Sequence, residues 1–149
     1  MKNLIVMRHA HAVNGGFSDF ERALTAEGVL EARAAGEQLK RASIAPDLII
    51  SSSAVRAAET ARNVATVLKF SPEKMIFDRV IYNCGGDRLL ELIRKSSGTV
   101  NTLMLIGHNP AVSVLASILT SNRNSMRPAE QVIICSTAKS WQDFDRFII

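Results

Sequence analysis

The stretch Leu4-Ile5-Val6-Met7-Arg8-His9-Ala10-His11 decides the fold, because an uninterrupted apolar run passes directly into an arginine and two histidines. A second stretch, Leu103-Met104-Leu105-Ile106-Gly107-His108-Asn109-Pro110, has the same organisation. Neither apolar run alternates with polar residues, which is typical of strands buried on both faces of a parallel sheet. Ligands of open α/β sheets gather at the carboxyl ends of the strands. If the two strands are neighbours, His9 and His108 meet in one pocket.

The rest of the chain alternates short apolar runs with longer segments of helical periodicity, which is the signature of successive βαβ units. This pattern predicts an α/β fold with a mostly parallel sheet, in a single domain that spans residues 1–149. Strands are expected at residues 3–7, 47–51, 75–77, 102–106 and 131–135. Helices are expected at residues 25–41, 54–68 and 87–95, and from residue 110 onward.

Two helix starts carry recognisable signals. Thr25 is the expected N-cap of the first helix, and Asn109 is the expected N-cap of the last one, with Pro110 at its first helical position. The connection at residues 8–24 is unusually long for a strand–helix loop, which indicates a functional loop. Residues 121–128 form a second, polar loop.

Composition narrows the classes of function. No apolar stretch approaches the roughly 20 residues of a membrane span. The beginning of the chain lacks the features of a signal peptide, so a cytoplasmic location is expected. The formal net charge is +4, but the 18 Lys and Arg are scattered among 14 Asp and Glu, so neither nucleic acid nor a membrane is expected as a partner. Cys84 and Cys135 have no close partner, which predicts reduced, buried thiols and no CxxC metal site.

Three arginines accompany the two histidines. Arg8 precedes His9, Arg22 lies on the same long loop, and Arg56 falls in the first turn of an expected helix. A cation there opposes the helix dipole at a cost of about 0.3–1 kcal/mol, which a bound anion would offset. We therefore expect Arg8, Arg22, Arg56 and His108 to bind the oxygens of one phosphoryl group.

His9 is the candidate nucleophile of such a pocket. A histidine can accept a phosphoryl group covalently and pass it to water. Nearby arginines disfavour the imidazolium form, and so they keep the ring neutral and nucleophilic. The sequence therefore predicts phosphoryl chemistry that proceeds through His9.

Motifs in order along the chain resemble those of the histidine phosphatase superfamily, and most closely its small SixA-type phosphohistidine phosphatases. Met7-Arg8-His9-Ala10 resembles the Arg-His-Gly signature with alanine in the third place. Residues 19–28 resemble the Asp-x-x-Arg-Pro-Leu-Thr-x-x-Gly segment, with Ala23 replacing proline. Residues 51–61 resemble the Ser-Ser-Pro-x-x-Arg-Ala-x-x-Thr-Ala element, residues 107–110 the second-histidine motif, and Ser140-Trp141 the late tryptophan.

The resemblance implies a three-layer α/β/α fold of the phosphoglycerate mutase-like kind and a metal-independent reaction without a cofactor. By the same resemblance, His9 becomes phosphorylated, and Arg8, Arg56 and His108 form the phosphate pocket. Arg22 is a supporting member.

The general acid is harder to place. Asp87 and Asp19 are the candidates, although Asp87 is also a natural cap for the third helix and Asp19 a natural partner to orient Arg22. Weak acid assistance would hinder cleavage of an alkyl phosphate ester more than cleavage of phosphohistidine, whose imidazole leaves readily. Without insertions large enough to form a lid, the site also suits a phosphohistidine presented on a protein surface.

Other functions remain open at this stage. On the same fold, a phosphatase of small phosphate esters is the main alternative to one that acts on a phosphorylated protein. A non-catalytic module that binds phosphate or phosphoprotein is another. His11 has no assigned role; with His9 and His108 it could supply three metal ligands, but the arginines and the lack of a suitably placed carboxylate argue against that site.

Overall fold

The computed structural model describes residues 1–15, 18–121 and 124–144. Along these residues the strands are β1 (Lys2–Arg8), β2 (Leu48–Ser52), β3 (Met75–Asp78), β4 (Thr102–Gly107) and β5 (Gln131–Ser136). The α-helices are α1 (Ala26–Arg41), α2 (Val55–Leu68), α3 (Gly86–Arg94) and α4 (Ala111–Thr120). Two short 3-10 helices are η1 (Pro72–Lys74) and η2 (Arg79–Tyr82). Each strand and helix expected from the sequence is present, with its ends displaced by at most one residue.

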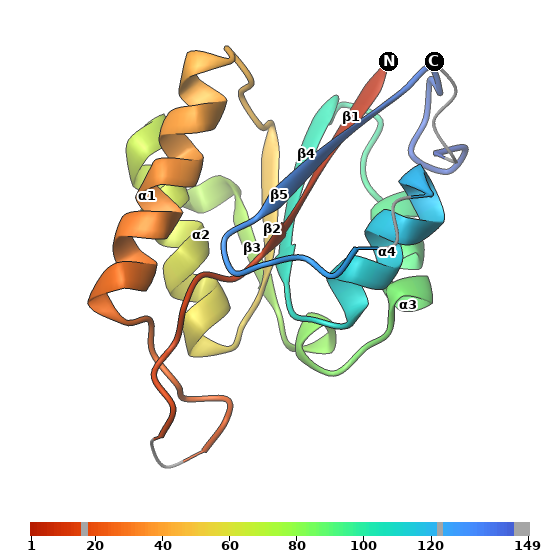
Figure 1. The fold of residues 1–149 in the computed structure, drawn as a ribbon. Helices are drawn as coiled ribbons and strands as arrows, with labels where there is room; N and C mark the ends of the chain where they lie inside the picture. Colours follow the sequence, from red (N-terminus) through yellow and green to blue (C-terminus); the bar gives the residue numbers. More distant parts are fainter. Residues whose placement is uncertain (16–17, 122–123, 145–149) are drawn as a thin grey trace.

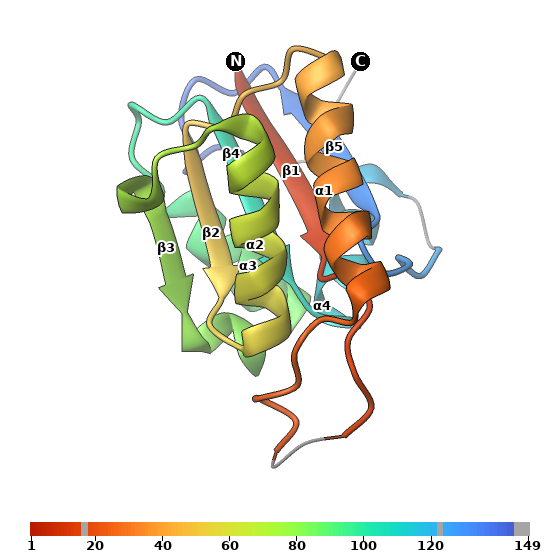
Figure 2. The ribbon, with the colours of Figure 1, turned by 90° about the vertical axis from the view of Figure 1, so that its left-hand side faces the viewer.

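The strands form one sheet in the order β3-β2-β4-β1-β5. The first four in this order are parallel, and β5 pairs antiparallel with β1 at the edge. The register aligns Arg8 with Gly107 and Ser51 with Ile106. The carboxyl ends of β1, β2 and β4 therefore lie at one edge of the sheet, beyond which the loop after β1 projects (Figure 2). This confirms the arrangement that the two histidine motifs require.

Helices cover both faces of the sheet, which gives the expected three-layer α/β/α architecture. α1 and α2 pack side by side on one face, and α3 and α4 cover the other (Figure 1). Burial on both faces explains why β1 and β4 are apolar without alternation: residues 4–7 and 103–106 are completely buried.

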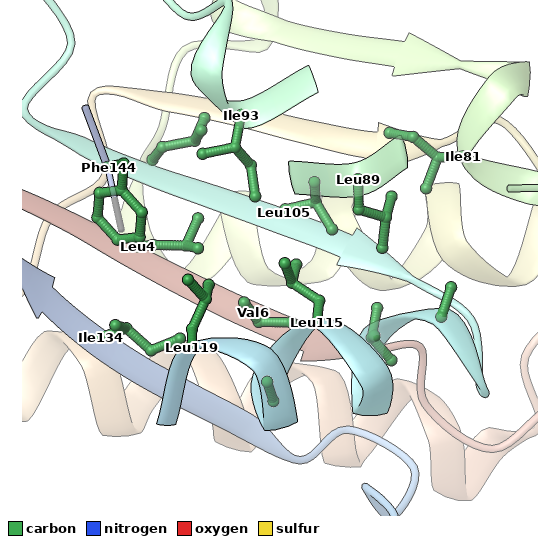
Figure 3. Close-up of a cluster of buried hydrophobic side chains, with 14 of the residues drawn as sticks. Leu4, Val6, Ile81, Leu89, Ile93, Leu105, Leu115, Leu119, Ile134 and Phe144 are labelled. Carbon is green, nitrogen blue, oxygen red and sulfur yellow. The ribbon is translucent and has the colours of Figure 1, made fainter. Parts of the chain in front are cut away.

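Two hydrophobic clusters fill the spaces between the layers. The larger cluster joins the sheet to α3 and α4 and includes Leu4, Leu105, Leu115 and Phe144 (Figure 3). The second joins the sheet to α1 and α2 and consists of side chains such as Ile5, Met7, Leu39, Val64 and Met104. Alternate residues of β1 thus enter opposite clusters, which fixes the register of the strand whose end carries His9.

Helix α1 begins as expected, and α4 does not. Thr25 caps α1, because its Oγ1 accepts a hydrogen bond from the Gly28 N–H at 2.9 Å. At α4 the N-cap is Pro110, one residue later than predicted, and Asn109 does not cap the helix. The Asn109 amide instead donates to the Met126 carbonyl at 2.9 Å. A tertiary contact has therefore overridden the capping preference.

Both cysteines are more exposed than expected, and the structure describes only part of the two expected loops. Cys84 and Cys135 are free but only half-buried, because Cys84 follows η2 in a loop and Cys135 lies on the edge strand β5. The expected loops at residues 8–24 and 121–128 include residues 16–17 and 122–123, which lie outside the described residues. Among the described residues, no helix combines the length and apolar character needed to cross a membrane.

Candidate active site

His9 and His108 meet where β1 and β4 end. Their ring centroids are 5.2 Å apart, and the two residues are only 8% and 7% exposed. The backbone fixes His9 directly, because its N–H donates to the Gly107 carbonyl at 3.0 Å. The ladder between β1 and β4 thus continues one step beyond β1 and places the two rings together.

The contacts of the His9 ring determine its tautomer. Nδ1 lies 2.7 Å from the Ala10 carbonyl oxygen, which can only accept, so Nδ1 carries the proton. Nε2 accepts a hydrogen bond from Arg56 Nε at 3.3 Å. Burial lowers the pKa of His9 to about 4, and the nearby arginines, Arg56 foremost, add to this effect. The ring is therefore neutral and presents an unprotonated Nε2 to Arg56.

Arg56 lies in the first turn of α2, where the sequence placed it, and is 6% exposed. α2 has no side-chain cap, so the positive end of its dipole is not offset by one. Besides its bond to His9, Arg56 donates from Nη1 to the Asp19 carbonyl at 2.7 Å and from Nη2 to Asp19 Oδ2 at 3.0 Å. A guanidinium has five N–H groups, so these three bonds leave one on each terminal nitrogen for a ligand.

Arg8 and His108 each have a buried ring or guanidinium nitrogen without a hydrogen-bond partner in the described part of the chain. Arg8 Nη1 donates to the Met126 carbonyl at 3.0 Å, and His108 Nε2 lies 2.8 Å from Ser52 Oγ. Among the described residues, only four buried side-chain nitrogen or oxygen atoms lack a hydrogen-bond partner, and Arg8 Nε and His108 Nδ1 are two of them. Burial, with the charges of neighbouring groups, lowers the pKa of His108 to about 3. This ring is therefore neutral too.

Arg22 hydrogen-bonds to its own loop. Its Nε donates to the Val13 carbonyl at 2.7 Å, and its Nη1 donates to Asp19 Oδ1 at 2.9 Å. Its charge still contributes to the lowered pKa of His9. Of the four residues predicted to bind an anion, Arg56 and His108 contact His9 directly. Arg8 and Arg22 are near enough for their charges to lower the pKa of His9.

The two candidate acids differ sharply. The hydrogen bonds from Tyr82, Arg22 and Arg56 hold the pKa of Asp19 well below its usual range, so this carboxylate stays ionised. Asp19 therefore orients arginines and is unsuited to donate a proton. Asp87 is exposed in the first turn of α3, whose N-cap is Gly85, so the expected capping role of Asp87 is wrong.

Two residues of the site were missed by sequence reasoning. Tyr82, at the end of η2, donates its hydroxyl to Asp19 Oδ2 at 2.7 Å, and its ring centroid lies 5.4 Å from that of His108. Ser52 contacts His108 and also accepts the N–H of Ala54 at the start of α2. Ser52 stood in a recognised motif, but no local pattern linked Tyr82 to Asp19, 63 positions away.

His11 does not join this pocket. Its Nδ1 lies 2.7 Å from Glu31 Oε2 on α1, and its N–H donates to Glu31 Oε1 at 3.0 Å. Within the described part of the chain, one group of side chains has ligand atoms close enough to share a metal ion, namely His11, Glu27 and Glu31, within 4.8 Å of one another. The alternative of a metal held by His9, His11 and His108 is therefore wrong for the described residues.

The sequence of this chain is similar to a known family and to a protein of another organism. A model of the histidine phosphatase superfamily (branch 1) matches residues 4–77. An uncharacterised protein of Mycobacterium tuberculosis is 32% identical over 116 residues, which cover 77% of this chain and 70% of that protein.

Solved structures share the fold. The SixA protein of Agrobacterium tumefaciens has a TM-score of 0.79 at 23% identity, with 89% of this chain and 90% of that chain covered. The protein histidine phosphatase SixA in complex with tungstate has a TM-score of 0.77 at 23% identity, with 89% and 87% covered.

Proposed function

This chain belongs to the histidine phosphatase superfamily, and from that premise we propose that it is a phosphatase whose His9 accepts the phosphoryl group. The proposed substrate is phosphohistidine on a protein. The observation that carries this proposal is the set of unused hydrogen-bond donors around His9.

These donors form a site for an oxyanion. Leaving a buried polar group without a partner costs about 1–3 kcal/mol, and Arg8 Nε and His108 Nδ1 are both in that condition. Ser52 can donate its hydroxyl to His108 Nε2, which places the ring proton on Nδ1. Together with the remaining N–H groups of Arg56, these donors suit the three non-bridging oxygens of a phosphoryl group. The charge that builds up on these oxygens during transfer is offset by the two arginines.

The first step of the proposed reaction is attack of His9 Nε2 on phosphorus. The Nε2–P bond forms as the bond between phosphorus and the leaving group breaks, and the electron pair departs with the leaving group. The Ala10 carbonyl accepts a hydrogen bond from Nδ1–H at 2.7 Å, so it supports the positive charge that the ring acquires on phosphorylation. Arg56, now bound to the phosphoryl oxygens, no longer needs Nε2 as an acceptor.

The second step returns the enzyme to its starting state. Water attacks the phosphorus of phosphorylated His9, a P–O bond forms, the Nε2–P bond breaks, and orthophosphate leaves. Because the pKa of His9 is lowered to about 4, the released ring is neutral at physiological pH and ready for the next turnover.

The protonation states of Asp19 and His108 favour phosphohistidine as the substrate. An alkoxide leaving group requires a proton, but Asp19 stays ionised and His108 stays neutral down to about pH 3. An imidazole ring whose second nitrogen carries a proton leaves as a neutral molecule. Neither Asp19 nor His108 can therefore supply that proton, which favours a phosphoramidate over an alkyl phosphate.

A substrate panel tests this proposal. Wild type, His9→Ala and the control His11→Ala are assayed for phosphate release from a histidine-phosphorylated protein, an aryl phosphate, and sugar and nucleotide phosphates. We expect wild type and His11→Ala to prefer the phosphohistidine protein and His9→Ala to be inactive. Faster turnover of the small esters would replace the proposed substrate with a phosphate monoester. Binding of phosphoprotein without any turnover would instead indicate a non-catalytic module.

A further inference from the structure

We propose that Tyr82 is a positioning residue, whose hydroxyl holds Asp19 and, through Asp19, the Arg56 guanidinium against His9. This role presupposes the proposed phosphatase function and deepens it. Tyr82 is not part of any motif by which the chain resembles the family, and it touches the nucleophile only through other residues.

The contacts form a continuous chain from η2 to the nucleophile. Asp19 Oδ2 accepts from Tyr82 at 2.7 Å and from Arg56 Nη2 at 3.0 Å, so one oxygen joins the two side chains. The Asp19 carbonyl accepts a hydrogen bond from Arg56 Nη1 at 2.7 Å. Arg56 Nε then meets His9 Nε2. Asp19 thereby fixes the orientation in which Arg56 faces the nucleophile.

The hydrogen bond from Tyr82 adds an anchor from another segment to an exposed carboxylate on a loop. Its side chain is 53% exposed on the long loop after β1, where water screens an ion pair and the side chain would lose entropy in a fixed position. Arg22, the other partner of its carboxylate, belongs to the same loop and would move with it. Tyr82 belongs to a different segment, so its hydrogen bond ties the loop to η2.

Tyr82 is itself well placed to act as that anchor. Its ring packs edge-on against Phe20 at 5.0 Å and against His108 at 5.4 Å between centroids. The hydrogen bond to Asp19 raises the pKa of the Tyr82 hydroxyl, so the phenol keeps its proton and remains a donor. A phenol hydrogen bond to a carboxylate is charge-assisted and therefore stronger than a neutral one.

The alternative role for Tyr82 is direct proton donation to the leaving group. The two roles give different kinetics. A positioning residue affects all substrates alike, since every phosphoryl group meets the same Arg56. A proton donor matters more as the leaving group becomes more basic. A series of aryl phosphates of increasing phenol pKa separates these cases.

The test is a double-mutant cycle on the purified full-length chain with the phosphohistidine protein and the aryl phosphate series. Tyr82→Phe removes only the hydroxyl, and we expect kcat/KM to fall about tenfold, mainly through kcat. Asp19→Ala should lower it about a hundredfold. In the Asp19→Ala background, Tyr82→Phe should change kcat/KM by less than about twofold, because the hydroxyl has lost the group through which it acts.

Ser71→Ala is the matched control, since its hydroxyl also donates to a carboxylate, that of Glu73, within η1. It should retain wild-type activity. Equal losses from Tyr82→Phe in both backgrounds, a loss that grows with leaving-group pKa, or no loss at all would each overturn the positioning role while leaving the phosphatase function in place. A wild type that releases no phosphate from any substrate would overturn both.

Discussion

His9 and His11 are separated by one residue, yet they occupy opposite kinds of surroundings. His9 is buried beside His108, and Arg56 donates to its Nε2. His11 is exposed, and its ring pairs with Glu31 on α1. The same type of side chain is therefore buried among cationic groups or exposed beside a carboxylate, according to the element that it meets.

Backbone hydrogen bonds explain why His9 and His11 have different surroundings. The His9 N–H continues the β1–β4 ladder by donating to Gly107. Two residues later the His11 carbonyl accepts from the Thr25 N–H at 3.0 Å, at the cap of α1. The chain thus leaves the sheet between them and docks on the helix, so only His9 faces the strand ends.

The largest difference in activity is expected when each histidine is removed in turn. We expect His9→Ala to lower kcat by at least about 10⁴-fold, because it removes the proposed nucleophile. His11→Ala should keep turnover within about twofold. Steady-state phosphate release measures both, and comparable losses in the two variants would contradict the division of roles.

Arg56 provides the next largest effect, since it is the charged group that meets His9 directly. Arg56→Ala should lower kcat/KM by about 10²–10³-fold, the range for losing a donor to a transition-state oxyanion. The matched control is Arg62→Ala on the same helix, where the guanidinium lies 4.8 Å from the Phe77 ring, outside the pocket. Equal activity of the two variants would show that the pocket does not use Arg56.

The buried state of His9 also predicts how stability depends on pH. Its pKa is about 4 in the folded chain against 6.5 for an unperturbed histidine, so the unfolded state binds the extra proton. The free energy of unfolding should therefore fall as pH decreases from about 6.5 to about 4, by roughly 3 kcal/mol from His9 alone. Denaturant unfolding of wild type and His9→Gln should show a shallower pH dependence in the variant. Identical slopes would contradict the buried, neutral state of His9.

The His11 side of the comparison depends on a glycine. A Cβ at Gly28 would lie 2.1 Å from the His11 carbonyl oxygen, so the chain could not dock on α1 without moving. Gly28→Ala should destabilise the protein by about 2 kcal/mol. Gly98→Ala is the control, because nothing lies within 4 Å of a Cβ there. Thermal or denaturant unfolding compares the two, and equal stability would show that the docking is not tight.

The smallest effect is expected at the pair of His11 and Glu31. His11→Gln should change the free energy of unfolding by less than about 1 kcal/mol, because a polar contact between exposed side chains contributes little. A larger loss would mean that the pair holds the β1–α1 connection more firmly than its exposure indicates.

Sequence reasoning succeeded where a local pattern has a direct structural consequence. The apolar runs before His9 and His108 predicted neighbouring buried strands, and the helical pattern correctly placed Arg56 in the first turn of α2. These features depend on residues close together in the chain. They were enough to predict the architecture and the convergence of His9, Arg56 and His108.

The failures involve contacts between distant segments. Tyr82 donates to Asp19, which is 63 positions away in the sequence. The Asn109 amide donates to the Met126 carbonyl and does not cap α4. The carboxylate that contacts the His11 ring belongs to Glu31 on α1. No periodicity or spacing encodes such contacts, because they exist only once the loops are folded onto the strand ends.

The most direct test is to trap the phosphorylated enzyme. Wild-type protein is mixed with a phosphohistidine protein, quenched in base to preserve phosphoramidates, and digested for mass spectrometry. We predict acid-labile phosphate on His9, and none on His11 or His108. Phosphate on either of those histidines, or rapid turnover with no phosphate on any histidine, would contradict His9 as the nucleophile.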